Sequence, residues 1–186
     1  AERGHEVVLL EAAARAGGQV LLATKASWRK NLQGIVDWRV SELERLDVDV
    51  RLNTYAEDAD VLALKPSLAI IATGGVPNVD WLPGSEFLTS AWDILSGVAT
   101  PAEDALIVDG TGRHVALSAA DVCHAHGTLV TFATIDETLA AEQSYAESVI
   151  WRKWAREIQL PMHTEEALIG VRRDGNQVVA TLRSEL

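Results

Sequence analysis

The sequence predicts an α/β fold class, with two successive doubly wound folds that are both incomplete and a β-hairpin near the C-terminus. Three observations predict it. Short apolar runs alternate with amphipathic segments at helical spacing, in two successive cycles. Segments 3–11 and 126–134 share one pattern, in which a glycine at the end of a helix precedes an apolar strand. A glycine-rich turn at 110–112 lies between an apolar run and a helical segment, as in Rossmann-like nucleotide-binding folds.

The first cycle occupies residues 6–75. Residues 6–10 form a leucine- and valine-rich run after a glycine, which is typical of a buried parallel strand. From residue 28 to 46 apolar residues recur at helical spacing with charged residues between them, which predicts a helix. The other elements expected in this cycle are a loop at Gly17-Gly18, an alternating strand at 48–52 and a buried strand at 68–72 that ends in Thr73-Gly74-Gly75.

A domain junction is predicted within residues 76–88, where prolines and a glycine interrupt the pattern. We therefore expect a partial first domain at 1–82 and a second domain at 83–186. Ser90 is expected to cap a short helix through Leu95. The second cycle then comprises strand 105–108, turn 110–112, helix 113–125, strand 129–133, helix 145–158 and a hairpin of strands 171–173 and 178–182 around Asp174-Gly175-Asn176.

Composition excludes several classes of function. The formal net charge is −11 and no basic cluster interrupts it, so nucleic acid is not an expected partner. The single cysteine, Cys123, cannot build a disulfide framework or an iron–sulfur site. No apolar run reaches the roughly 20 residues of a membrane span, and the first residues lack a signal peptide, so we expect a cytoplasmic protein. The histidines show no metal-ligand spacing, and no metal site is predicted.

Glu11 is the residue that most specifically indicates a nucleotide-binding function. A carboxylate at the C-terminal end of the second strand of such a fold can accept both hydroxyls of an adenosine ribose. The alternative is an ordinary surface glutamate at a strand end. Gly17 and Gly18 follow, and paired glycines let a backbone approach a pyrophosphate closely, while Gln19 could hydrogen-bond a ring or a phosphate. An ordinary flexible loop explains the same glycines.

The phosphate-binding turn of the first fold is not found in the sequence. We expect it just before residue 1, because Ala1-Glu2-Arg3 resembles the end of the helix that follows such a turn. That turn and the N-terminus of its helix would hold the phosphates. The chain by itself is therefore expected to bind FAD or ADP weakly or not at all.

The second fold has an altered fingerprint. Gly110 and Gly112 stand where the first two glycines of Gly-x-Gly-x-x-Gly belong, but Val115 replaces the third. Thr134 stands where an acid that binds NAD would be expected, with Asp136 two residues further on. This pattern favours a structural, vestigial fold over one that binds NAD(P)H.

Segments 4–11, 17–19 and 70–77 together resemble the C-terminal nucleotide-binding half of the trimethylamine dehydrogenase and 2,4-dienoyl-CoA reductase family, whose parent is an old-yellow-enzyme-like NADH:flavin oxidoreductase. The resemblance extends over essentially the whole chain. Residues 103–116 are most similar to the amine-oxidising branch, which includes amine dehydrogenases and N-demethylases.

The resemblance implies a parent flavoprotein with an N-terminal FMN barrel and a four-iron cluster, neither of which this chain contains. It also implies FAD or ADP at the first fold and an electron-transfer partner, and an oligomer is possible. By position, the implied cofactor contacts in the first fold are Glu11 and Ala12 at the adenosine ribose, Gly17, Gly18 and Gln19 along the cofactor, Tyr55 and Ala56 beside the adenine, and Thr73 and Gly74 over the nucleotide.

Three functions therefore compete. The first is a nucleotide-binding segment of a flavin-dependent amine dehydrogenase or N-demethylase, and the second is a segment of an NAD(P)H-dependent ene or dienoyl-CoA reductase. The third is a non-catalytic docking or structural module with relic nucleotide sites. The altered fingerprint argues against the second, and the intact Glu11 and Gly-Gly-Gln sequence argue against the third. The parent is an oxidoreductase in the first two cases, and this chain alone is expected to be inactive.

Overall fold

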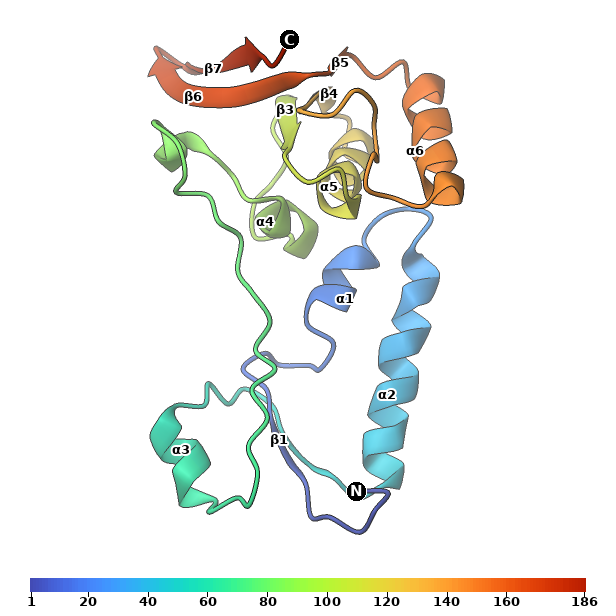
Figure 1. The fold of residues 1–186 in the computed structure, drawn as a ribbon, viewed down its shortest axis with the longest axis vertical. Coiled ribbons are helices and arrows are strands. Elements are labelled where there is room, and N and C mark those ends of the chain that lie inside the picture. Colours follow the sequence, from blue (N-terminus) through green and yellow to red (C-terminus); the bar gives the residue numbers. More distant parts are fainter. The chain divides into compact units, whose positions relative to one another are not determined.

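A computed structural model describes all 186 residues, which divide into two compact units. Unit 1 comprises Ala1–Thr24 and Arg29–Val76, and unit 2 comprises Lys25–Trp28 and Pro77–Leu186 (Figure 1). Helices alternate with short parallel strands in both units, and an antiparallel hairpin ends the chain. The structure thus confirms the predicted α/β class and the C-terminal hairpin.

Unit 1 is built on one parallel strand pair. β1 (Val8–Leu10) pairs with β2 (Asp49–Arg51), with Val8 opposite Asp49 and Leu10 opposite Arg51. Two of its helical elements, the five-residue helix at Gln19 and the six-residue helix at Asp58, were not predicted. The helical elements are α1 (Gln19–Ala23), η1 (Lys30–Leu32), α2 (Gln33–Arg45) and α3 (Asp58–Ala63).

Helix α2 follows the predicted 28–46 pattern but begins later and buries little of its apolar face. Val36 is its only buried residue, and Ile35 and Trp38 are half exposed. Gly17 fits against this helix because it has no side chain. A Cβ there would lie 3.0 Å from Val36 Cγ1 and 2.8 Å from Leu21 Cγ. The packing of α1 on α2 therefore requires a glycine at this position.

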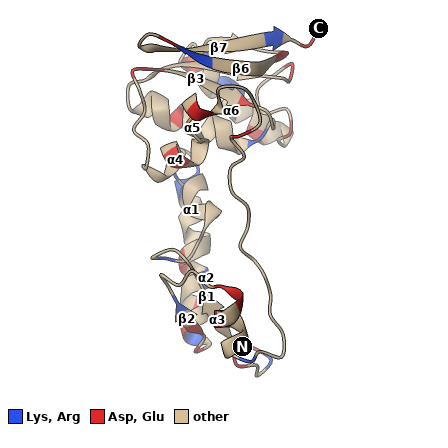
Figure 2. Ribbon diagram, turned by 90° about the vertical axis from the view of Figure 1, so that its left-hand side faces the viewer, with Lys and Arg blue, Asp and Glu red and all other residues tan.

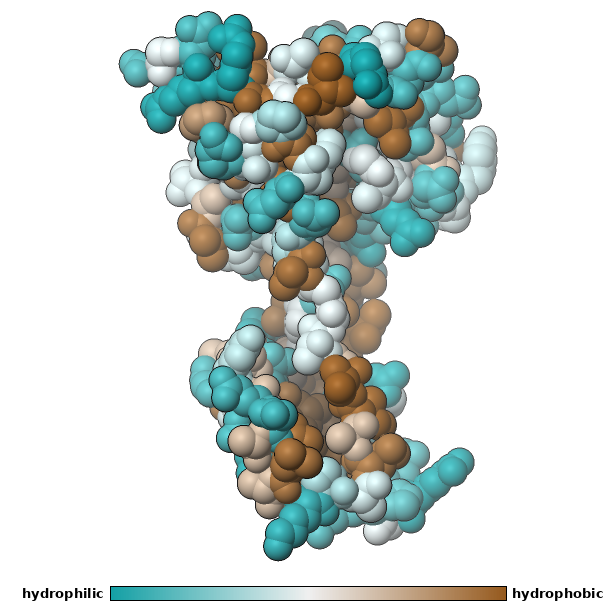
Figure 3. Space-filling view, turned by 60° about the vertical axis from the view of Figure 1, so that its left-hand side comes forward, coloured by the Kyte–Doolittle hydropathy of each residue, from teal (hydrophilic) through white to brown (hydrophobic).

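The predicted strand at 68–72 is wrong. These residues form no strand and pair with none, and Leu68, Ile70 and Ile71 are 75%, 82% and 87% exposed. An extended segment becomes a strand only when a neighbour supplies its hydrogen bonds, and the sheet of unit 1 has only β1 and β2. Figure 3 shows apolar side chains at the surface of unit 1 as a result.

Unit 2 contains a three-stranded parallel sheet in the order β3–β4–β5. Ser90 caps the first of its helices as predicted, since its Oγ accepts a hydrogen bond from the Trp92 backbone N–H at 3.0 Å. The elements of unit 2 are η2 (Ser85–Phe87), α4 (Ala91–Ser96), β3 (Asp104–Asp109), α5 (His114–Ala125), β4 (Leu129–Thr134), α6 (Tyr145–Glu157), β5 (Met162–His163), β6 (Glu166–Asp174) and β7 (Gln177–Ser184).

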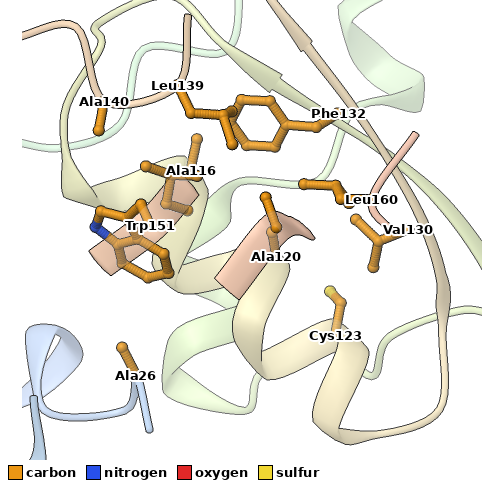
Figure 4. Packing of buried hydrophobic residues seen from close by; sticks show 12 residues of the cluster. Ala26, Ala116, Ala120, Cys123, Val130, Phe132, Leu139, Ala140, Trp151 and Leu160 are labelled. Carbon is orange, nitrogen blue, oxygen red and sulfur yellow. The ribbon is translucent and has the colours of Figure 1, made fainter. Parts of the chain in front are cut away.

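The core of unit 2 forms where α5 and α6 pack on the sheet. Trp151 of α6 and Phe132 of β4 are fully buried, with the small residues Ala116 and Ala120 of α5 between the larger side chains (Figure 4). Trp151 also meets Trp28 and Trp154 edge-on, with ring centroids 5.4 and 5.6 Å apart. Such edge-to-face contacts add to the free energy gained by burying apolar surface. Cys123 is buried in the same cluster, as the sequence predicted.

The segment 25–28 belongs to this core although it precedes the rest of unit 2 by about fifty residues. Asp121 of α5, which is 6% exposed, accepts the Ser27 backbone N–H at 2.6 Å and the Ser27 hydroxyl at 3.1 Å. These bonds place Ala26, which is fully buried, against the cluster. A buried carboxylate thus fixes a chain segment 94 residues away in sequence.

Lysine and arginine residues are interspersed with aspartate and glutamate along both units (Figure 2). The ion pairs formed by arginine side chains, such as Arg45 with Glu42 and Arg183 with Glu185, lie at exposed positions. Exposed pairs contribute little to the free energy of folding. None of the helices is both long enough and apolar enough to cross a lipid bilayer.

Gly84 and Gly97 offer a matched test of packing. Both have positive φ, 84° and 80°, but a Cβ at Gly84 would collide with the Val171 carbonyl whereas Gly97 faces open space. Replacing Gly97 by alanine should cost about 1 kcal/mol of unfolding free energy, because only the left-handed backbone is penalised. Gly84→Ala should cost about 1–3 kcal/mol more, because the hairpin strand must move. Urea unfolding followed by near-UV circular dichroism measures both; equal losses would contradict the packing of β6 on Gly84.

Asp121→Ala should lower the free energy of unfolding of unit 2 by about 2 kcal/mol, since two hydrogen bonds to a buried carboxylate are lost. Ser27→Ala removes only the hydroxyl bond and should cost roughly half as much. The same urea experiment compares them. If Asp121→Ala proved no worse than Ser27→Ala, the backbone bond from Ser27 would not hold this segment.

Candidate functional site

Glu11 lies immediately after β1, where the sequence placed it. Its backbone N–H donates to the Arg51 carbonyl at 3.0 Å, and its own carbonyl accepts from Thr54 N–H at 2.9 Å. The side chain is half-buried, and one carboxylate oxygen accepts the Ala13 backbone N–H at 2.8 Å. Ala12 beside it is exposed. The carboxylate is thus oriented at the carboxyl end of the strand pair, which is where open α/β sheets bind ligands.

Gly17, Gly18 and Gln19 form the turn that leads into α1. Both glycines have positive φ, 130° and 48°, so the turn uses conformations that other residues rarely adopt. Gln19 is the first residue of α1 and directly follows the predicted Gly17-Gly18 loop. A Cβ on Gly74 would lie 3.1 Å from Gln19 Nε2. The structure therefore brings together two predicted segments that are 55 positions apart in sequence.

The other predicted residues of this group are less constrained. Tyr55 is 82% exposed and Ala56 is exposed, both in the chain that follows β2. Thr54 ties this chain to Glu11 through its backbone bond. Thr73 is exposed in the unpaired segment that precedes Gly74. An apolar cavity of about 360 Å³ is also present in unit 1, but none of the predicted residues lines it; its lining includes Val40, Leu43, Val48 and Val50.

The second predicted turn, Gly110-Thr111-Gly112, joins β3 to α5 and is organised by Asp109. The Asp109 side chain is 2% exposed, and its Oδ1 accepts the backbone N–H groups of Thr111 at 2.9 Å and Gly112 at 3.2 Å. The Thr111 hydroxyl donates to the same oxygen at 3.0 Å. Burial raises the pKa of Asp109, and although these hydrogen bonds oppose the shift, the nearby Asp136 carboxylate adds to it.

Asp109 was part of the predicted fingerprint but was not recognised as a functional residue. Its Oδ2 is buried and has no hydrogen-bond partner in the structure. The sequence did contain an indication of this role. Asp109 directly follows an apolar strand and directly precedes Gly-x-Gly, and an aspartate in such a place can accept hydrogen bonds from the N–H groups of the turn. Gly110 itself has open space around its Cα, whereas Gly112 is buried.

No family model matches the sequence. The chain is similar to curated proteins in three bacteria. It is 45% identical to a multifunctional alkene reductase/demethylase of Caballeronia cordobensis over 95% of this chain, 38% identical to a probable N-methylproline demethylase of Rhizobium meliloti over 99%, and 37% identical to an N,N-dimethylglycine/sarcosine dehydrogenase of Chromohalobacter salexigens over 100%. The chain spans 26–28% of the length of these relatives.

Solved structures share the fold at lower sequence identity. A 2-naphthoyl-CoA reductase superposes with a TM-score of 0.87 at 21% identity, covering 98% of this chain and 28% of the reductase. A 6-hydroxypseudooxynicotine amine oxidase of Pseudomonas geniculata gives a TM-score of 0.81 at 20% identity, covering 99% of this chain and 30% of the oxidase. A bacillithiol disulfide reductase of Bacillus cereus gives 0.55 at 10% identity, covering 98% of this chain and 69% of that reductase.

The sequence relatives and the shared fold agree with the resemblance seen in the sequence. The chain matches, over nearly its whole length, a segment of multidomain flavin oxidoreductases of the old-yellow-enzyme and trimethylamine dehydrogenase type, in their N-demethylase and amine dehydrogenase branch, which also has ene reductase relatives.

Proposed function

We propose that this chain supplies the adenine-nucleotide site of a flavin-dependent enzyme that oxidises methylated amines. The observation that carries the proposal is the Glu11 carboxylate, held at the end of β1 by the Ala13 N–H, six residues before the Gly17-Gly18 turn. A carboxylate in this place can accept the two hydroxyls of a ribose. Support for the amine substrate comes from the relatives, whose names include two demethylases and a dimethylglycine/sarcosine dehydrogenase.

In this proposal the chain comprises two incomplete Rossmann-like folds, with the bounds expected from the sequence. Residues 1–82 are the FAD- or ADP-binding domain, and residues 83–186 are a degenerate NAD(P)-type domain. The residues of unit 1 fit an adenosine nucleotide in three respects. Glu11 has a carboxylate oxygen that the Ala13 bond leaves available, the Gly17-Gly18 turn exposes backbone, and Gln19 and Gly74 approach each other from two segments. Ala12 would lie beside the ribose, Tyr55 and Ala56 beside the adenine, and Thr73 with Gly74 over the nucleotide.

The chemical step belongs to other parts of the enzyme. The bound flavins supply electron transfer, and this chain's residues bind and orient the adenine nucleotide. With one cysteine, the chain cannot ligate a four-iron cluster, which would come with the FMN barrel from another part of the protein. That barrel and an electron-transfer protein are the proposed partners.

Glu11→Gln should weaken ADP binding about 10–100-fold, because a charge-assisted hydrogen bond to the ribose is replaced by a weaker one. The measurement uses a chimera in which this chain replaces the matching 185 residues of the Rhizobium meliloti relative. Isothermal titration with ADP, after removal of bound nucleotide, gives the affinity, and the adenine content of the purified protein gives the occupancy.

Glu6→Gln is the matched control, because Glu6 is an exposed glutamate of the same unit that precedes β1. It removes the same charge without touching the ribose and should leave ADP binding unchanged. An equal loss of ADP affinity in the two variants would show that net charge, and not a ribose contact, affects binding. Unchanged affinity in both would show that Glu11 does not contact the nucleotide.

An NAD(P)H-dependent ene reductase is the second candidate, favoured by the alkene reductase named among the relatives and by the 2-naphthoyl-CoA reductase fold match. The same chimera separates the two. Because the part of the chimera that oxidises the amine comes from the relative, the response to NADPH is what tests this chain. Under anaerobic conditions NADPH should leave the flavin of the chimera oxidised. Bleaching by NADPH alone would favour the reductase.

A further inference from the structure

The N–H groups of the second glycine turn are already bonded to the protein itself. In dinucleotide-binding folds the turn between the first strand and its helix presents N–H groups to a pyrophosphate. Here the Thr111 and Gly112 N–H groups donate to Asp109 Oδ1, at 2.9 and 3.2 Å. Asp109 is 2% exposed, so the acceptor of both bonds is buried, and the bond from Gly112 is buried as a whole. An internal carboxylate therefore occupies the donors that a phosphate would need.

The space over the turn is also filled. The second glycine of the fingerprint is required so that a backbone can approach a pyrophosphate closely. A Cβ on Gly112 would lie 2.8 Å from Asp136 Oδ2, 3.0 Å from Glu142 Cγ and 3.0 Å from the Glu142 backbone nitrogen. The Glu142 N–H also donates to the Gly112 carbonyl at 3.1 Å. The close approach at Gly112 is thus made by residues 136–142, which we call the covering loop.

The covering loop is held down by core packing. Its Leu139 and Ala140 are 2% and 1% exposed and belong to the buried cluster around Trp151 and Phe132. Its first carbonyl, that of Asp136, accepts the Glu165 N–H at 3.1 Å. Lifting the loop to admit a ligand would expose both apolar side chains to water, which costs free energy.

Electrostatics oppose a phosphate in the same place. Three carboxylates, from Asp109, Asp136 and Glu142, lie around the turn. A dianionic pyrophosphate would have to displace one of them and lie near the other two, and like charges a few ångströms apart repel each other. The only basic residue within the turn sequence, Arg113, is exposed to solvent.

We propose that the nucleotide site of unit 2 is self-occupied: Asp109 takes the place of the pyrophosphate and the covering loop fills the remaining space, so this unit binds no NADH or NADPH. The inference is independent of Glu11 and of any cofactor in unit 1, because every contact that carries it lies within unit 2.

The experiment is amide NMR of the ¹⁵N-labelled 186-residue chain. Millimolar NADPH, NADH or inorganic pyrophosphate should leave the Thr111 and Gly112 signals unmoved. In Asp109→Ala, hydrogen exchange at these two amides should accelerate at least about tenfold, because their buried acceptor is gone. Asp104→Ala removes an exposed acid at the other end of β3 and should change neither amide.

Shifts of these two amides on adding NADPH or pyrophosphate to the unmodified chain would overturn the proposal, as would unchanged exchange in Asp109→Ala. If Asp109→Ala does not fold, a pH titration of the unmodified chain tests the same hydrogen bonds. The Thr111 and Gly112 shifts should titrate together as acid protonates Asp109, and should still do so in Asp136→Asn and Glu142→Gln, the two other carboxylates that face the turn. Absence of such a titration would show that Asp109 does not hold these N–H groups.

Discussion

Unit 2 depends on the burial of one indole. Trp151 is fully buried at the point where α6, α5 and the segment 25–28 converge, and its neighbours are either aromatic rings placed edge-on or small side chains that leave room for it. Burying a tryptophan removes more apolar surface from water than any other side chain can. Helices α5 and α6 have 12 and 13 residues, a length at which an isolated helix is only marginally stable in water, so packing around this indole adds to their stability.

Unit 1 has no comparable centre. Its sheet has two three-residue strands, and its longest helix buries a single residue. The side chains that would form a core, such as Leu68, Ile70 and Ile71, are exposed. Two contacts order the unit: the backbone ladder between β1 and β2, and the fit of Gly17 against α2. The candidate ligand residues lie on this framework, so a bound nucleotide would itself contribute to the stability of the unit.

Sequence reasoning predicted the features that depend on neighbouring residues. The Ser90 cap, the buried Cys123, the place of Glu11 after β1 and the turn after β3 all follow from local pattern. The prediction of a strand at 68–72 was wrong because an apolar run indicates a preference for burial but does not show whether a partner strand is present. Helix α3 was missed because its cap is an unusual glutamate, Glu57, paired with Asp60.

The parts of the candidate sites that could not be predicted depend on contacts between distant segments. The approach of Gln19 to Gly74 joins residues that no spacing rule relates. The covering loop lacks any motif, and its closure over Gly112 follows from the burial of Leu139 and Ala140. The position of Asp109 before the turn can be read from the sequence. That its side chain accepts the Thr111 and Gly112 N–H groups is known only from the structure.

The Asp121–Ser27 bonds have a consequence for how this protein can be divided. Unit 2 includes four residues, Lys25–Trp28, from the middle of unit 1's sequence. A polypeptide that begins at Pro77 would lack Ala26 and Trp28. Trp151 would lose one of its two tryptophan neighbours, and Asp121 would lose the two hydrogen bonds from Ser27. The two units are therefore interleaved along the chain. Recombination that exchanges one unit between relatives therefore has to keep residues 25–28 together with unit 2.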